Sequence, residues 1–322
     1  MIREENMHTP SGEHPSNGHT HHRHGDHDHA LPSSPDSSGH DHEHGHRHGP
    51  EAPPGPKRPG ILLAAFGTAV AQACQAYEIF ETEVHERFPD IPVAWAYTAH
   101  KVRRKLAKTG KERDCVATAL SRIHDHGVTH LVVQSLHTVP GVEYFWTQNL
   151  AKAYEHPRKG FHQVSLGTPL LHDENDLERA RTCLASFIPK ERTADEAVIL
   201  VGHGTYHRGQ QRYLDFQTCI RKEDPLLFMG LLMGEPGLLS LIERLHRAKV
   251  STVWLLPFMA VSGHHVRKDM FGDHSHSWQN QLAAAGFLVR KRVLGTIEFP
   301  CFRTIWLDHL AEAMDCLRIT AS

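Results

Sequence analysis

Two histidines follow apolar stretches of this sequence and stand beside glycines, where an imidazole can reach a ligand. His203 lies between two glycines, directly after the apolar run 197–201. His265 belongs to a Gly-His-His segment that follows the apolar run 253–256, and at most one of the adjacent pair His264 and His265 is expected to be a primary ligand. Neutral imidazole binds divalent transition metals and accepts protons near neutral pH. Both positions are therefore candidates for metal or proton chemistry.

Several other donors near these histidines have two interpretations each. His207 could share a side of the first helical turn with His203, but on its own it is more typical of a surface residue or of one that supports a ligand. Glu235 stands just before a predicted helix, where a carboxylate is a base, a metal ligand, or an acid stabilised by the helix dipole; local grounds favour the last. A further cluster is either a metal entry path or a solvated polar face, and it comprises Asp269, Asp273, His274 and His276.

The first 59 residues predict a disordered metal-binding tail. Thirteen of the 30 histidines lie in the first 50 residues, interspersed with Asp, Glu, Arg and Gly, and a Pro/Gly-rich stretch ends the segment. Almost no large apolar side chains are available there to offset the entropy of ordering. A flexible strand of imidazoles and carboxylates suits Ni, Co, Zn or Fe. A neutral low-complexity tail or a purification tag is the alternative, although a tag is usually an unbroken histidine run.

Composition excludes several classes of function. The 322 residues carry a formal net charge of −2, which argues against a nucleic-acid binder or a polybasic membrane-surface protein. No run of about 18 apolar residues exists, and the N-terminus lacks the apolar stretch of a secretory signal, so a cytoplasmic protein is expected. The six cysteines are widely spaced, with no CxxC pair, and are expected to be reduced thiols. Walker, GxGxxG and GxSxG motifs are missing from residues 60–322, so phosphate-cradling, dinucleotide and serine-hydrolase functions lack support.

Short apolar runs alternate with helical patterns after residue 59, which predicts an α/β fold with parallel sheets covered by helices on both faces. The expected strands are 61–66, 93–97, 131–134, 163–166, 197–201, 226–229, 253–256 and 287–290. The expected helices include 73–88, 111–126, 142–154, 174–187, 208–220, 238–247 and 300–317.

The sequence also contains an internal repeat. Residues 61–68 align with 198–205, and residues 131–141 align with 253–263. We therefore expect two similar lobes, 60–190 and 191–322, that face a cleft beyond the carboxyl ends of their strands. In this alignment His203 matches Phe66 and His265 matches Glu143, so a metal site would lie in one lobe only. Chance recurrence of apolar strands and a Gly-Thr pair is the alternative.

The sequence resembles the anaerobic cobalt chelatases of the CbiK type in three segments, which are residues 201–207, 259–270 and 135–141. The resemblance spans the chain from about residue 60 to its end. It implies two chelatase-like lobes related to the ferrochelatase fold, and a class II chelatase that inserts Co(II) into sirohydrochlorin without ATP, on the way to cobalamin. No organic cofactor is implied.

The resemblance also implies a metal site of two histidines and a glutamate. The histidines fall on His203 and His265. The family pattern is roughly Gly-Thr-Val-Glu-Gly, and an ungapped match places Met233 at the glutamate position, with Glu235 two residues later. Either the loop brings Glu235 to the metal or the site is altered, since a thioether favours softer metals and accepts no proton. We take His203, Glu235 and His265 as the expected metal-binding and catalytic residues.

The sequence leaves competing functions open. The same fold could insert Fe, Ni or Zn instead of Co, or act on a related tetrapyrrole. A two-lobed metal-binding or storage protein without turnover is the alternative from another class. Expected partners are sirohydrochlorin and divalent metal ions, the latter also on the histidine-rich tail, and a homo-oligomer is possible.

Overall fold

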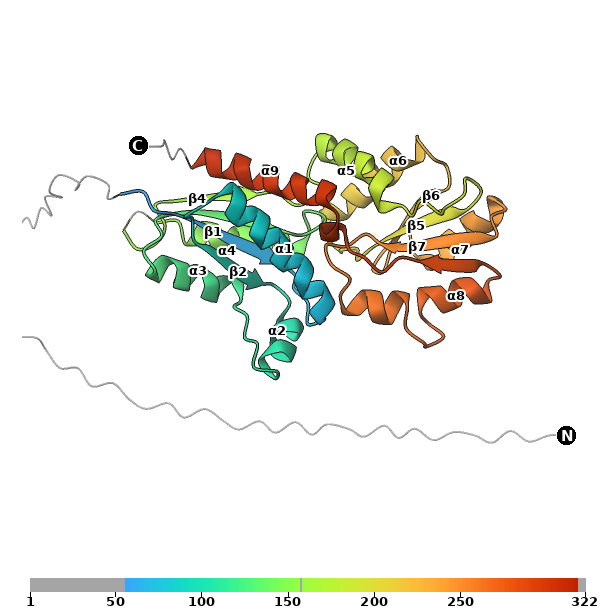
Figure 1. Ribbon diagram of the computed structural model, residues 1–322, viewed down its shortest axis with the longest axis horizontal. Helices are drawn as coiled ribbons and strands as arrows, with labels where there is room; N and C mark the ends of the chain where they lie inside the picture. Colours follow the sequence, from blue (N-terminus) through green and yellow to red (C-terminus); the bar gives the residue numbers. More distant parts are fainter. Residues whose placement is uncertain (1–55, 157, 318–322) are drawn as a thin grey trace, which may run out of the picture. The chain divides into compact units, whose positions relative to one another are not determined.

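The computed structural model describes residues 56–317 except residue 157 (Figure 1). The predicted histidine-rich tail falls almost entirely outside these residues. The first half of the described chain contains β1 (Pro59–Ala65), α1 (Ala71–Arg87), β2 (Val93–Tyr97), α2 (His100–Ala107), α3 (Val116–Asp125), β3 (His130–Ser135), α4 (Val142–Ala153), β4 (Gln163–Gly167) and α5 (Glu174–Phe187). The second half contains β5 (Ala197–Gly202), η1 (Arg208–Gln210), α6 (Gln211–Arg221), β6 (Leu227–Leu231), α7 (Leu238–Arg247), β7 (Thr252–Pro257), η2 (Val266–Met270), α8 (Trp278–Ala284), β8 (Leu288–Lys291), η3 (Thr296–Glu298) and α9 (Pro300–Cys316).

Two four-stranded parallel sheets form the framework, and they have the same topology. The strand orders are β2-β1-β3-β4 and β6-β5-β7-β8. The pairing registers also agree, because Ile61 pairs with Val132 in the first sheet and Val198 pairs with Trp254 in the second. These are the positions that the sequence repeat aligns. The predicted α/β fold with two similar parallel-sheet lobes is confirmed.

Side chains on the two faces of each central strand enter different cores. Ile61 and Leu63 of β1 share one continuous core with Val198 and Leu200 of β5. The opposite face of β1 packs under α3 and α4, and the opposite face of β5 packs under α7 and α8. Strands buried on both faces read as unbroken apolar runs, which is why the sequence located them well.

The last helix of each half crosses to the other sheet. Helix α9 follows the second sheet in sequence but packs on β3 and β4 of the first, while α5 packs on α6 beside the second sheet (Figure 1). Both helices contribute to the core that the two sheets share. The exchange ties the sheets together and fixes the relation between their strand ends.

One cysteine prediction is wrong. Cys183 of α5 and Cys301 of α9 form a disulfide, with Cα atoms 5.6 Å apart. The pair is 118 residues apart in sequence, so spacing alone could not reveal it. The packing of α5 against α9 brings the two thiols together. Elsewhere in the described chain, four cysteines are free: Cys74, Cys115, Cys219 and Cys316.

Two local differences from the predicted elements have simple causes. Helix α2 was not expected, because only Leu106 of its residues is buried and no apolar pattern marks it. Helix α3 begins at Val116, later than predicted, with the Cys115 sulfur accepting a hydrogen bond from the Thr118 amide. Within the part of the chain described, no helix is long and apolar enough to cross a membrane.

Candidate functional site

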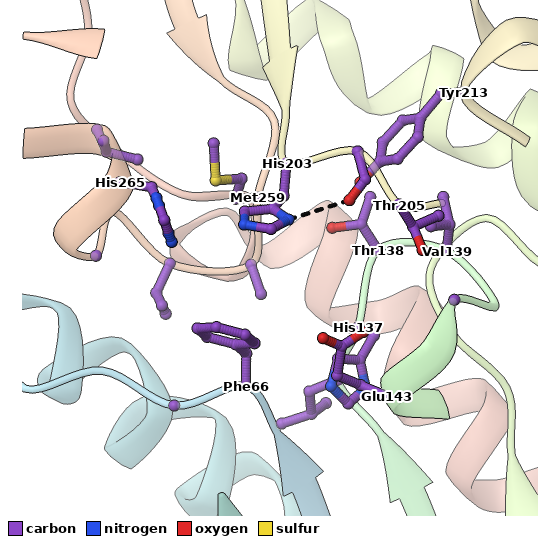
Figure 2. Close-up of a pocket in the computed structure, with 18 of the residues that line it drawn as sticks. Phe66, His137, Thr138, Val139, Glu143, His203, Thr205, Tyr213, Met259 and His265 are labelled. Carbon is purple, nitrogen blue, oxygen red and sulfur yellow. Dashed lines mark hydrogen bonds between the residues drawn. The ribbon is translucent and has the colours of Figure 1, made fainter. Parts of the chain in front are cut away.

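A pocket lies beyond the carboxyl ends of the central strands of both sheets. The segments that follow β1, β3, β5 and β7 line it, and its empty space, including the opening to solvent, is about 780 Å³. This is the position at which parallel α/β sheets bind ligands, and the size suits a large organic molecule. The lining includes Phe66, Leu136, His137, Thr138, Val139, Glu143, His203, Thr205, Tyr213, Met259, Val261 and His265 (Figure 2).

His203 and His265 lie together on the second-sheet wall of this pocket. Their ring centroids are 4.8 Å apart, and the rings are inclined at 72°. The direct bond from an imidazole nitrogen to a divalent metal is about 2.0–2.1 Å, so one ion can reach both rings. The two strand ends of the second lobe therefore converge as the repeat predicts.

Hydrogen bonds set the tautomers of both rings. The Nδ1 atom of His203 is 3.0 Å from the carbonyl oxygen of Gly204, and Nδ1 of His265 is 2.6 Å from Oδ2 of Asp269. Since a carbonyl and a carboxylate can only accept, Nδ1 carries the proton in the neutral form of each ring, and Nε2 then has the lone pair. A histidine whose outer nitrogen donates to a carboxylate is a common arrangement at metal sites.

Electrostatics favour the neutral, metal-binding form of His203. Burial lowers the pKa of His203 below its ordinary value, and the neighbouring His265 acts in the same direction. The opposing contributions come from the hydrogen bond to Gly204 and from the Glu143 and Asp269 carboxylates. A neutral ring is required, because a protonated imidazole has no lone pair for a metal.

The backbone around His203 is closely fitted. The carbonyl oxygen of His203 accepts a hydrogen bond of 2.9 Å from the amide of Met233. Gly204 has a φ of +81°, and a Cβ atom at that position would lie 1.9 Å from the carbonyl oxygen of Met233. Only glycine can occupy this turn, and the turn holds the His203 ring at the pocket.

The wall from the first sheet carries a different set of groups. His137 follows β3, and Glu143 lies in the first turn of α4 (Figure 2). The Nδ1 atom of His137 is 2.9 Å from the hydroxyl oxygen of Ser135, while its Nε2 is buried and has no hydrogen-bond partner among the described residues. Burial lowers the pKa of His137 to about 4, with the Glu143 carboxylate opposing the shift. His137 is therefore a neutral base near neutral pH.

The structure does not bring Glu235 to this pocket. Its side chain is exposed, and Oε2 accepts hydrogen bonds from the Gly237 amide at 2.8 Å and the Ser240 hydroxyl at 3.2 Å. These contacts place the carboxylate at the N-terminus of α7, where it stabilises the helix. The Met233 side chain is not part of the pocket lining either.

Glu143 is the pocket carboxylate that the expected site set omitted. The sequence contained two signals, because residues 137–144 offer polar groups at a strand end and the repeat aligns Glu143 with His265. Neither signal led to Glu143, because the family resemblance directed the carboxylate role to residues 233–235. His207 has a structural role: its Nδ1 accepts from the Gly209 amide at 3.1 Å, and its ring packs on Phe145. Across residues 56–317, leaving out residue 157, no three His, Cys, Asp or Glu side chains are grouped to hold a metal ion. A metal on His203 and His265 would therefore keep positions open for other ligands.

Comparisons with known proteins place the chain in a family. The family model described as cobalt chelatase (CbiK) matches residues 59–315. The sirohydrochlorin cobaltochelatase CbiKC of Nitratidesulfovibrio vulgaris (Hildenborough) is 38% identical over 260 residues, which cover 80% of this chain and 91% of that protein. The sirohydrochlorin cobaltochelatase of Salmonella typhimurium is 28% identical over 257 residues, covering 79% and 96%.

A solved structure agrees with the fold. The sirohydrochlorin chelatase SirB of Bacillus subtilis subspecies spizizenii, in complex with cobalt, superposes with a TM-score of 0.52. The superposition covers 80% of this chain and 96% of SirB, with 13% sequence identity. At this identity the likeness supports the chelatase fold alone.

Proposed function

This chain belongs to the cobalt chelatase (CbiK) family, and from that premise we propose that it inserts Co(II) into sirohydrochlorin without ATP. The proposal rests on one observation: the pocket has two walls, one from each sheet, and the walls carry different functional groups. Two imidazoles stand on one wall, and their Nε2 atoms have no hydrogen-bond partner among residues 56–317; a carboxylate and a buried neutral imidazole stand on the other wall. Both curated relatives described above are named sirohydrochlorin cobaltochelatases.

We assign metal binding to His203 and His265. Chelation requires the metal to exchange its ligands one by one for the four ring nitrogens. A site with only two protein donors suits that exchange, since the remaining positions stay available to water and to the macrocycle. The hydrogen bond from His265 to Asp269 orients the ring and strengthens the imidazole as a ligand.

We assign proton removal to the opposite wall. Insertion releases two pyrrole N–H protons, and general bases within the pocket must accept them. Glu143 is half-buried at the pocket, and His137 is held neutral by burial. In this assignment Glu143 has the carboxylate role, and Glu235 caps α7.

The remaining lining suits a flat tetrapyrrole. Phe66, Leu136 and Val261 give the ring apolar surface. Three residues after the lining residue Thr205, the Arg208 guanidinium lies 5.5 Å from the centre of the Phe145 ring, and it makes no ion pair within the described residues. We propose that Arg208 meets a peripheral carboxylate of the substrate, since a guanidinium binds carboxylates well.

The decisive experiment is an anaerobic insertion assay with the full-length protein, sirohydrochlorin and Co(II), followed by the change in the absorption spectrum. We expect turnover above the uncatalysed rate, without ATP. Parallel assays with Fe(II), Ni(II) and Zn(II) identify the preferred metal. Stoichiometric metal binding with no increase in insertion rate would favour a storage protein and overturn the proposal. A cytoplasmic location and a homo-oligomer stay predictions.

A further inference from the structure

Three histidine rings form a row that runs from the surface into the pocket. The ring centroids of His264 and His265 are 6.1 Å apart, and those of His265 and His203 are 4.8 Å apart. His264 is exposed, His265 is half-buried at the pocket lining, and His203 lies deeper. The row therefore connects solvent with the wall to which we assign metal binding.

The geometry of the row permits a metal to pass along it. Two imidazoles that share one ion have ring centroids no more than about 6.5 Å apart, given metal–nitrogen bonds of about 2.0–2.1 Å. Both spacings in the row are below this limit. The 4.8 Å spacing lets His265 and His203 share an ion, and the exposed His264 ring has to turn toward His265 for that pair to do the same.

The segment that carries the row is held against the first lobe. A Cβ atom on Gly263 would lie 3.5 Å from the hydroxyl oxygen of Thr68. Arg267 donates a hydrogen bond of 3.2 Å to the side-chain oxygen of Gln72 at the start of α1. His265 itself stands at the start of the π-helical turn η2, with helical backbone angles. These contacts fix the position of the segment 263–267, and with it the position of the exposed His264 side chain beside the pocket.

His264 has no other task that the structure reveals. Within the described part of the chain it makes no hydrogen bond or ion pair, and its one ring contact is with His265. The nearby charges do not explain metal attraction by themselves, since Asp269 and Asp273 are balanced by Arg267 and Lys268. The feature of this segment that would attract a metal ion is therefore its imidazole side chains.

We infer that His264 is the outer ligand of a metal entry route, which passes the ion to His265 and then to His203. The inference rests on the proposed chelatase function and adds the path by which its metal arrives. Each transfer exchanges one imidazole for the next, so the ion never has to shed its whole water shell at once. Because His264 acts before the ion reaches the macrocycle, it affects metal capture and leaves the insertion step unchanged.

The test compares His264→Gln with His276→Gln in the full-length protein. His276 is exposed and has no ring contact with the row in the described chain. It belongs to the cluster 269–276, which this inference takes as a solvated polar face, and it therefore serves as the matched control. Insertion rates are measured against buffered free Co(II) at saturating sirohydrochlorin. We expect His264→Gln to raise the half-saturating Co(II) concentration about tenfold with kcat within about twofold, and His276→Gln to match the wild type. An unchanged half-saturation for His264→Gln, or an equal shift in both variants, would overturn the inference.

A second measurement does not depend on turnover. Diethyl pyrocarbonate modifies free imidazoles, and mass spectrometry of peptides reports the extent at each histidine. We expect buffered Co(II) to protect His264 several-fold more than His276. Equal protection of His264 and His276 would show that His264 is not part of a metal entry site. Selective protection without any insertion activity keeps the entry site and contradicts the chelatase assignment instead.

Discussion

The two lobes share a framework and differ at the ends of their central strands. Strand order and pairing register are the same in both sheets. Beyond β1 and β5, the equivalent positions are Phe66 and His203, whose rings lie 6.0 Å apart across the pocket. Beyond β3 and β7, Glu143 is equivalent to His265. The framework positions these groups, and the side chains alone decide what each wall does.

This difference explains why two copies of one lobe form a single asymmetric site. If both walls carried imidazole pairs, a metal would be bound from both sides and no group would be free to accept pyrrole protons. If both carried carboxylates, the pocket would prefer harder cations. In the proposed assignment, one imidazole wall and one carboxylate wall separate metal binding from proton removal.

The largest effect is expected from His203→Ala. We expect insertion to fall by at least about 1000-fold, because the variant removes one of two metal ligands and the buried end of the row. The unfolding midpoint should change little, since the ring lines a pocket instead of filling a core. Turnover and thermal unfolding are measured together, with His246→Ala as the control, because His246 of α7 is exposed and does not line the pocket. Near-normal turnover by folded His203→Ala would contradict the assignment.

The next effect compares two carboxylates. Glu143→Gln should lower kcat by about 100-fold, the usual scale for loss of a general base, with metal affinity almost unchanged. Glu235→Gln keeps the shape of the helix cap and should leave kcat within about twofold. Steady-state kinetics of both variants separate the roles. If kcat fell strongly in Glu235→Gln and stayed unchanged in Glu143→Gln, Glu235 and not Glu143 would be the catalytic carboxylate.

These two residues also show how far the sequence could lead. The repeat and the apolar runs predicted both sheets, because buried parallel strands leave an unbroken apolar signal. His203 and His265 were found because glycines and strand ends marked them. Glu143 was not selected, because the resemblance directed the search for a carboxylate to residues 233–235. Its importance arises from the meeting of two strand ends, which only the packing of the lobes establishes.

The disulfide was missed for a related reason. Helix α9 returns to the first sheet and brings Cys301 to Cys183, and no local pattern records such an exchange. Replacing both cysteines by alanine should lower the free energy of unfolding by about 3 kcal/mol, while insertion stays within about twofold, since neither residue lines the pocket. Urea unfolding and the insertion assay measure the two effects. Alkylation of all six thiols in unreduced, unfolded protein would show that the bridge does not form.

A smaller effect is expected on the pH dependence of stability, through His137 on the wall from the first sheet. The pKa of His137 is about 4 in the folded protein, against about 6.5 in an unfolded chain. The unfolded chain therefore binds a proton first, and stability falls as pH drops from about 6.5 to about 4. The His137→Gln variant lacks this titrating group. Between pH 7 and pH 5 its free energy of unfolding should therefore fall by about 2 kcal/mol less than that of the wild type. Urea unfolding at both pH values measures the difference; equal losses would show that His137 does not stay neutral.

The smallest effect is expected from deleting residues 1–55, which leaves Arg58 and β1 in place. The removed segment holds 13 histidines, and we predict that it captures metal ions. A segment that only concentrates ions raises their local supply and adds nothing to the transition state. The truncated protein should match the full chain at saturating Co(II) and fall behind when free Co(II) is scarce. Insertion rates against buffered metal, for both lengths, measure this. Coincident curves would show that the tail does not supply this reaction, whereas a loss that persists at saturation would make the tail a third part of the site, beside the two walls.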